Sequence, residues 1–251
     1  MTHPMVLAHA EDGVLTLTLN RPDKRNALHP ELVQSLSELI TEAADDESIA
    51  VIVITGSGGA FCAGLDIDLL AAWSSVERME YLDSAIAMLR NIWDAPQPTI
   101  AAVDGPAIAG GFDLAAFCDI RLASPDAFFG QAEINMGLVQ IVHPLYKTIG
   151  LGRAKELALT GANISADEAY RIGLVNHVYP AAELLERAHA MAAVMASKPR
   201  FALFETKRLT RELIDLDTAE ALEQVEQSFC RCLNTHEHHE RVARFLERHR
   251  R

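Results

Sequence analysis

The chain has 251 residues, and its 35 aspartates and glutamates outnumber its 22 lysines and arginines, which gives a formal charge of −13 at pH 7. A surface of this charge repels phosphate backbones, so general nucleic-acid binding is disfavoured. An anionic ligand would need a local group of basic side chains or free backbone N–H groups.

Neither membrane insertion nor secretion is expected. The most apolar stretch, residues 99–120, is interrupted by Asp104, Pro106, Asp113 and Asp119, whereas a membrane span needs about 20 apolar residues in succession. Residues 1–10 lack the cationic start and apolar core of a signal peptide. The four cysteines show no C-x-x-C spacing, so we expect free thiols in a reducing compartment, the cytoplasm.

Strands and helices alternate through the first two thirds of the sequence. The pattern V-L-T-L-T-L at residues 14–19 predicts a strand that a turn at Gly13 pairs with residues 6–10. Pro30 is typical of a helix start. The next amphipathic helix carries an apolar stripe of Met79, Leu82, Ile86, Leu89 and Trp93. Further strands are predicted at residues 50–55, 99–103, 119–123 and 174–178, and a capping box at residues 165–168 predicts a short helix that Gly173 ends. The alternation predicts an α/β fold.

The last third of the sequence has helices but no strands for them to cover. The helical patterns span residues 181–197, 201–213, 217–234 and 237–251. The third of these helices carries an apolar stripe of Leu222, Val225, Phe229 and Leu233, which must pack on the other helices, on the body or on another subunit. We therefore divide the chain into an α/β core, residues 1–195, and a helical region, residues 196–251.

The loop after the strand at residues 50–55 is rich in glycine. Its sequence, G-S-G-G-A-F-C-A-G-L-D at residues 56–66, fails the dinucleotide pattern G-x-G-x-x-G because Phe61 stands at the last glycine position. The loop is either a plain tight turn or a source of free backbone N–H groups at Gly64 and Leu65. In the second case it would receive a carbonyl oxygen or an anion.

A second glycine-rich segment, residues 104–115, links a buried strand to an apolar helix. Gly110 and Gly111 allow another group to approach the backbone closely, and amides at a helix start suit an oxygen that gains negative charge. Asp113 follows Gly110 by three residues and lies in the first turn of that helix. It either serves such a site or caps the helix.

The third unusual segment contains a glutamate in mostly apolar surroundings. Glu133 follows F-F-G-Q-A at residues 128–132, where desolvation would raise its pKa and suit it to proton transfer near neutral pH. The alternative is a structural glutamate held in an ion pair.

Four motifs in series resemble the enoyl-CoA hydratase/isomerase (crotonase) superfamily. They are R-P-D-K-R-N-A-L at residues 21–28, F-C-A-G-L-D at residues 61–66, G-G-F-D-L-A at residues 110–115 and F-G-Q-A-E at residues 129–133. The similarity runs from about Val6 to the C-terminus. It is more specific for the superfamily than for the reaction, because the fold hosts several chemistries.

The resemblance implies a spiral of β-β-α units, a helical C-terminal trimerisation region that also covers the active site, and a homotrimer or a dimer of trimers. The ligand would be a coenzyme A thioester, so that no separate cofactor or metal is needed. By their positions in the motifs, Leu65 and Gly110 would supply the oxyanion-hole N–H groups, and Asp113 and Glu133 the two carboxylates. The expected coenzyme A contacts are Lys24, Arg25, Ala27, Ala63, Asp66, Ile67 and Asp68, of which Lys24 and Arg25 would meet its phosphates.

Three departures from the typical hydratase pattern bear on the reaction. Position 113 is aspartate rather than glutamate, which shortens its reach by about 1.5 Å. Residues 138–144, L-V-Q-I-V-H-P, replace a glycine-rich turn and should reshape the acyl pocket, and Asp68 stands where a lysine is common. An enoyl-CoA hydratase with Glu133 as acid and base is the first hypothesis. A 3,2-enoyl-CoA isomerase, another coenzyme A ester reaction and a noncatalytic ester-binding relative are the alternatives.

Two histidine-containing segments have simpler interpretations. His143 is a candidate catalytic group because histidine titrates near neutrality, yet a lone loop histidine is more often structural than catalytic. The run His236 to Glu240 does not fit H-E-x-x-H, so a solvated helix face is predicted there and no metal. RNA binding, known in some members of the superfamily, is disfavoured by the acidic charge and the lack of a lysine-rich helix.

Overall fold

The computed structural model describes residues 4–249, and its largest element is a six-stranded sheet. The strands are β1 (Val6–Glu11), β2 (Val14–Leu19), β3 (Val51–Gly56), β4 (Thr99–Val103), β6 (Ile120–Ala123) and β9 (His177–Val178), in that order across the sheet. Only β1 and β2 pair antiparallel. The predicted strand at residues 174–178 is therefore real but shorter than expected.

A second sheet of three short strands lies beside the first sheet's loops. It consists of β5 (Pro106–Ile108), β7 (Phe128–Gly130) and β8 (Asn163–Ser165), in the order β5-β7-β8. β5 and β7 run parallel, and β8 is antiparallel to β7. The end of β7 leads into the 3-10 helix η2 (Ala132–Met136), which carries Glu133.

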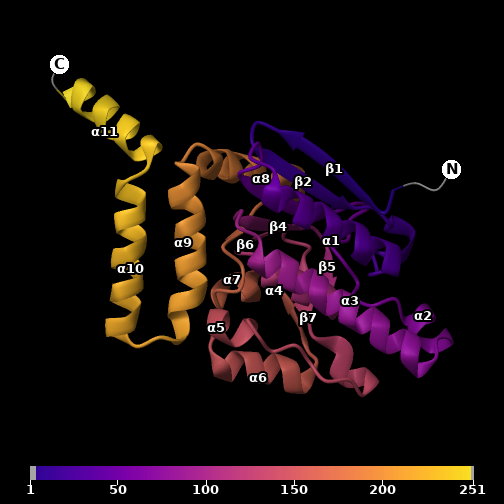
Figure 1. The fold of residues 1–251 in the computed structure, drawn as a ribbon. Coiled ribbons are helices and arrows are strands. Elements are labelled where there is room, and N and C mark those ends of the chain that lie inside the picture. Colours follow the sequence, from indigo (N-terminus) through magenta and orange to yellow (C-terminus); the bar gives the residue numbers. More distant parts are fainter. Residues whose placement is uncertain (1–3, 250–251) are drawn as a thin grey trace.

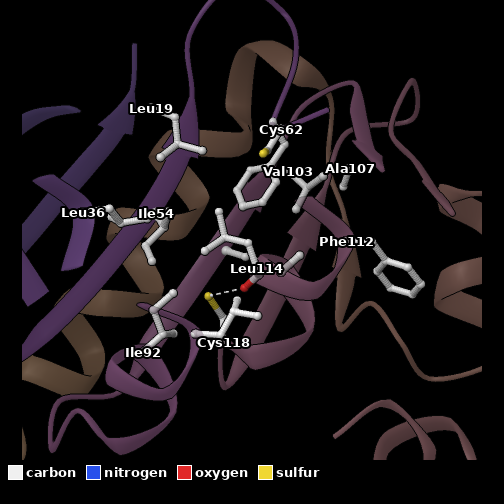
Figure 2. Close-up of a cluster of buried hydrophobic side chains, with 14 of the residues drawn as sticks. Leu19, Leu36, Ile54, Cys62, Ile92, Val103, Ala107, Phe112, Leu114 and Cys118 are labelled. Carbon is white, nitrogen blue, oxygen red and sulfur yellow. Dashed lines mark hydrogen bonds between the residues drawn. The ribbon is translucent and has the colours of Figure 1, made fainter. Parts of the chain in front are cut away.

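Helices cover both faces of the larger sheet. In β3, Ile52 and Ile54 face the core under α1 (Pro30–Asp45), α3 (Ser75–Asp94) and α4 (Gly110–Phe117), whereas Val51 and Val53 pack against α8 (Ala181–Ala196) on the other face. This alternation confirms that the apolar strand at residues 50–55 is covered on each side. Figure 2 shows part of the first core, where side chains from β2, α1, β3, α3, β4 and α4 come together. They are Leu19, Leu36, Ile54, Ile92, Val103 and Leu114.

The helix α3 has the predicted location but a different buried face. Its N-terminus carries a capping box formed by Ser74 and Glu77. The residues that it buries are Tyr81, Ala85, Met88, Leu89 and Ile92. Of the predicted stripe, Met79, Leu82 and Ile86 are 59%, 42% and 37% exposed. The sequence carries two overlapping apolar stripes, and the one with Ala85 is buried because a small residue lets α3 approach its neighbours closely.

The remaining helices lie outside the central sheet. They are α2 (Ile67–Ala72), α5 (Leu145–Ile149), α6 (Leu151–Thr160), α7 (Ala166–Arg171), α9 (Arg200–Glu212), α10 (Thr218–Leu233) and α11 (His236–His249), with short 3-10 turns η1 (Pro22–Lys24) and η3 (Leu213–Asp215). In α7, Ser165 Oγ accepts from Glu168 N as predicted, but the Glu168 carboxylate pairs with Arg171 instead of completing the capping box.

Of the C-terminal helices, α9 is held to the body by hydrogen bonds from Arg200, Lys207 and Arg211 to backbone oxygens, whereas α10 and α11 lie farther out. Figure 1 shows α9 and α10 side by side as a hairpin, with α11 projecting beyond its end. Leu222, Val225, Phe229 and Leu233 of α10 are all exposed in the single chain. The division of the chain at residue 195 remains a prediction.

All four cysteines are free thiols. Within residues 4–249, no helix is both long and apolar enough to cross a bilayer.

Candidate active site

The loop after β3 runs beside β5 as if it were one more strand. Cys62 N donates to Pro106 O (3.0 Å), and Ile108 N donates back to Cys62 O (3.0 Å). Two residues further on, Gly64 O accepts from Leu28 N (2.8 Å). These backbone bonds fix the path of the chain into Leu65.

The start of α4 meets this loop in direct backbone contact. A Cβ added to Gly64, which has φ +86°, would lie 3.0 Å from Gly110 N and 2.7 Å from Ile108 O. Ala109, just before the helix, has φ 53° and ψ −128°, a strained conformation for a residue with a side chain. Its N–H donates to Gly130 O at the end of β7 (2.8 Å). The loop after β3, the start of α4 and the end of β7 therefore meet at one point.

Two backbone N–H groups at this point have no acceptor. Neither Leu65 N nor Gly110 N donates a hydrogen bond to any residue between 4 and 249. Gly110 is the first residue of α4, where the helix dipole adds partial positive charge. The pair can thus receive an oxygen that gains negative charge, as the second interpretation of the glycine-rich loop requires.

Asp113 is not the cap of α4. The N-cap position is Ala109, and no side chain forms a capping bond there. Asp113 is buried, with only 3% of its surface exposed, and its Oδ1 accepts a hydrogen bond from Gln131 Nε2 (3.4 Å). Burial and, second, the charge of Glu133 raise the pKa of Asp113 well above its ordinary value, while the Gln131 bond opposes the shift.

Glu133 is a half-buried carboxylate without an ion-pair partner among the described residues. Its Oε2 is buried and accepts no hydrogen bond. Burial raises the pKa of Glu133, as expected from its apolar surroundings, and the Gln140 side chain opposes the shift. The structural alternative, a salt-bridged glutamate, is therefore absent here.

Two glutamines that the sequence interpretation overlooked connect these carboxylates. Gln131 Nε2 donates to Ile141 O (2.8 Å) as well as to Asp113, and Gln140 Nε2 donates to Gln131 O (2.8 Å). The signal for Gln131 was its place in the F-G-Q-A-E motif. The sequence signal for Gln140 was that it is the single polar residue in the apolar run at residues 138–142.

The expected coenzyme A contacts lie on two adjacent segments, the loop after β2 and the start of α2. Ala63 N donates to Arg25 O (3.0 Å), which joins the segments, and Ala27 is buried beside them. The Arg25 side chain is exposed and forms no ion pair within the described part of the chain. Lys24 instead pairs with Asp68 (2.9 Å).

Asp66 and Ile67 differ in what they offer a ligand. Asp66 is buried, caps α2 and accepts from Arg21 at 2.5 Å, so its carboxylate is already occupied. Ile67 is exposed. The overlooked residue of this region is Asn26, which is fully buried and binds Arg21 N (2.8 Å), Ser57 O (2.9 Å) and Ala60 O (2.7 Å). Asn26 thus fastens the loop after β2 to the loop after β3.

His143 lies among aromatic rings rather than beside the carboxylates. Its ring meets those of Trp93 and Tyr146 edge-on, with centroids 5.7 Å and 5.8 Å away. Burial and the charge of Lys147 lower its pKa, while Asp215 opposes them. At the C-terminus, His236 pairs with Glu240, and no cluster suited to a metal is found in residues 4–249.

Two open grooves of the single chain lie elsewhere. One, of about 550 Å³, lies between α9 and α10 and is lined mostly by charged side chains such as Arg208, Glu212 and Arg231. The other, of about 600 Å³, lies between α1 and α3. No predicted site residue lines either groove, so the chemical candidate remains the point where the free amides and the carboxylates meet.

Comparisons with known proteins agree with this assignment. A probable enoyl-CoA hydratase of Mycobacterium tuberculosis is 38% identical over 91% of this chain and 85% of its own length. A crotonyl-CoA hydratase of Syntrophomonas wolfei is 34% identical over 99% and 97%. The crystal structure of an enoyl-CoA hydratase from Bacillus anthracis superposes with a TM-score of 0.94, at 30% identity over 97% of this chain and 96% of that one.

These likenesses confirm the crotonase-like fold expected from the motifs. The sequence model of the enoyl-CoA hydratase/isomerase family matches residues 9–251. The chain belongs to the enoyl-CoA hydratase/isomerase family.

Proposed function

We propose that this protein is an enoyl-CoA hydratase, which adds water across the double bond of a 2-enoyl-CoA thioester. The observation that carries the proposal is the pair of free N–H groups, Leu65 and Gly110, next to two carboxyl groups of raised pKa, Asp113 and Glu133. The hydratase names of relatives that share nearly the whole chain support the same reaction.

The two N–H groups would hold the thioester oxygen. As the oxygen of water forms a bond to the β-carbon, the electron pair of the double bond moves toward the carbonyl, and the resulting enolate oxygen is stabilised by Leu65 N–H and Gly110 N–H. Glu133 takes a proton from the water and then returns one to the α-carbon, so the sum of the steps is the addition of one water molecule. Removing one donor from such a hole typically costs about 10²–10³-fold in rate.

Asp113 has a supporting part in this scheme. Its raised pKa favours the protonated form, which donates a hydrogen bond to the attacking water rather than accepting its proton. Glu133 is the less buried of the two and is therefore the base. The same raised pKa of Asp113 also favours the second candidate, a 3,2-enoyl-CoA isomerase, in which Glu133 alone moves a proton between two carbons.

The remaining parts of the proposal concern the ligand and the assembly. The exposed Arg25, with Lys24 near it, would meet the phosphates of coenzyme A, and Ala27, Ala63, Asp66, Ile67 and Asp68 would form the rest of that surface. Coenzyme A is part of the substrate, and the chemistry needs no further cofactor. We also propose a homotrimer or a dimer of trimers formed through the C-terminal helices, located in the cytoplasm.

The test is the ultraviolet absorbance of the conjugated enoyl thioester with a 2-enoyl-CoA and, separately, the matching 3-enoyl-CoA. Hydration lowers the absorbance in the first assay. The Glu133→Gln variant should still bind the ester but should show little of this decrease in absorbance. Glu42→Gln, a change at an exposed position of α1, is the matched control and should behave as the wild type. A rise with the 3-enoyl ester and no loss with the 2-enoyl ester would identify the isomerase, and full activity of Glu133→Gln would reject Glu133 as the base.

A further inference from the structure

Three buried oxygens without a hydrogen-bond donor lie around the candidate carboxylates. They are Gln131 Oε1, Glu133 Oε2 and Gln140 Oε1, three of the five buried side-chain atoms without a partner in residues 4–249. Nearly all buried acceptors in folded proteins have a donor, and a cluster of exceptions indicates a place that a water or ligand fills. What is missing here is a set of donors, since all three atoms are acceptors.

The side chain of Gln140 is held in one orientation by the backbone. Its Nε2 donates to Gln131 O (2.8 Å), and Gln131 Nε2 donates in return to Ile141 O (2.8 Å). These two bonds tie the loop at residues 140–141 to the segment that carries Glu133. Because the amide nitrogen is turned toward Gln131 O, the amide oxygen is the atom of Gln140 that has no partner and can meet a ligand.

The attacking water of a hydration has a defined set of hydrogen bonds. One lone pair faces the β-carbon, and the two hydrogens need two acceptors, of which the base is one. Asp113 is a poor second acceptor because it is buried, already accepts from Gln131 and, in the scheme above, donates to the water. Gln140 Oε1 has no donor, and its side chain lies beside Glu133.

We propose that Gln140 is a catalytic residue, whose amide oxygen accepts the second hydrogen of the attacking water while Glu133 Oε2 accepts the first. This inference rests on the proposed hydratase function. Gln140 thereby supplies the acceptor that Asp113, a hydrogen-bond donor to the same water, does not supply, and the loop at residues 138–144 contributes to the reaction itself as well as to the shape of the acyl pocket.

The test separates the step that uses water from one that does not. Hydration of a 2-enoyl-CoA needs the oriented water, whereas exchange of the α-hydrogens of butyryl-CoA with deuterium oxide needs only the base and the two N–H groups. Gln140→Met keeps the length of the side chain but has no acceptor oxygen. We expect kcat for hydration to fall about 10²-fold, as positioning errors near 1 Å typically cause, with KM and α-hydrogen exchange unchanged.

Two further variants guard against loss of the fold. Gln140→Asn keeps the amide but retracts it by one methylene, so it should again lose hydration but not exchange, and Gln140→Glu should also lose hydration because it replaces the N–H donor to Gln131 O with a second carboxylate beside Glu133. Equal loss of hydration and exchange in Gln140→Met and Gln140→Asn would mean that Gln140 only holds the loop, and wild-type hydration in both would also overturn the proposal. Exchange without hydration in the wild type would instead reject the hydratase function.

Discussion

The contact between Gly64 and the start of α4 provides a direct test of the oxyanion hole. In Gly64→Ala the new methyl group would lie 2.7 Å from Ile108 O, 2.8 Å from Ala109 Cβ and 3.0 Å from Gly110 N, so the two loops must move apart. The left-handed φ of +86° adds about 1–2 kcal/mol of strain. Displacing one amide donor typically costs about 10²–10³-fold. We therefore expect kcat for hydration to fall at least about 10²-fold, measured by enoyl-thioester absorbance.

A glycine in the same loop supplies the matched control. Gly59 also has a left-handed φ, +73°, but no atom lies within 4 Å of a Cβ placed there. Gly59→Ala should therefore lose a similar 1–2 kcal/mol or so of stability from backbone strain alone and keep its kcat. If Gly64→Ala keeps the kcat of Gly59→Ala, the two loops do not form the oxyanion hole and the reasoning is refuted.

Two further predictions follow from shifted pKa values. Asp113→Asn removes a buried group that can ionise. Because the fold raises the pKa of Asp113, this residue contributes stability below the unfolded pKa of about 4, and the contribution is lost as pH rises through the folded pKa. The variant should therefore have a higher melting temperature than the wild type at mildly alkaline pH, and equal melting temperatures there would contradict the prediction. Glu205 is the reverse case, since Arg208 and Arg231 lower its pKa to about 2. Glu205→Gln should lower the free energy of unfolding in urea by about 1–2 kcal/mol at neutral pH, and this difference from the wild type should disappear as pH falls from about 4 toward 2. A difference that does not depend on pH would exclude the carboxylate charge as its cause.

Local patterns in the sequence predict the elements that frame the site. The alternation in β2, the apolar run of β3 and the helix start at Pro30 each depend on neighbouring residues, so they are legible without the fold. The same holds for the glycines at the start of α4: a Cβ on Gly111 would lie 2.1 Å from Cys62 O, and one on Gly110 would lie 3.1 Å from Leu28 Cδ1. The motifs therefore point to the candidate amides and the candidate carboxylates.

Long-range contacts could not be predicted in the same way. Asn26 has partners up to 34 residues away, and Asp66 is occupied by Arg21, 45 residues before it. The choice between the two apolar stripes of α3 depends on the shape of its neighbours, which its own periodicity does not contain. In the sequence Gln140 is an isolated polar residue, and only the structure shows that its side chain lies beside Gln131 and Glu133.

The geometry of the proposed oxyanion hole depends mainly on the backbone, whereas the proposed reaction depends on side chains. The chain path at Leu65 and Gly110 is fixed by main-chain bonds between loops, namely Leu28 N to Gly64 O, Cys62 N to Pro106 O and Ala109 N to Gly130 O. Many sequences satisfy such bonds, provided that glycine stands where the loops touch. In the proposed reaction, the side chains that decide what happens to the bound ester project from this frame at residues 113, 133 and 140. In this scheme a change at one of these positions alters the path of water and protons without altering the backbone frame, and for this reason the reaction has to be tested there.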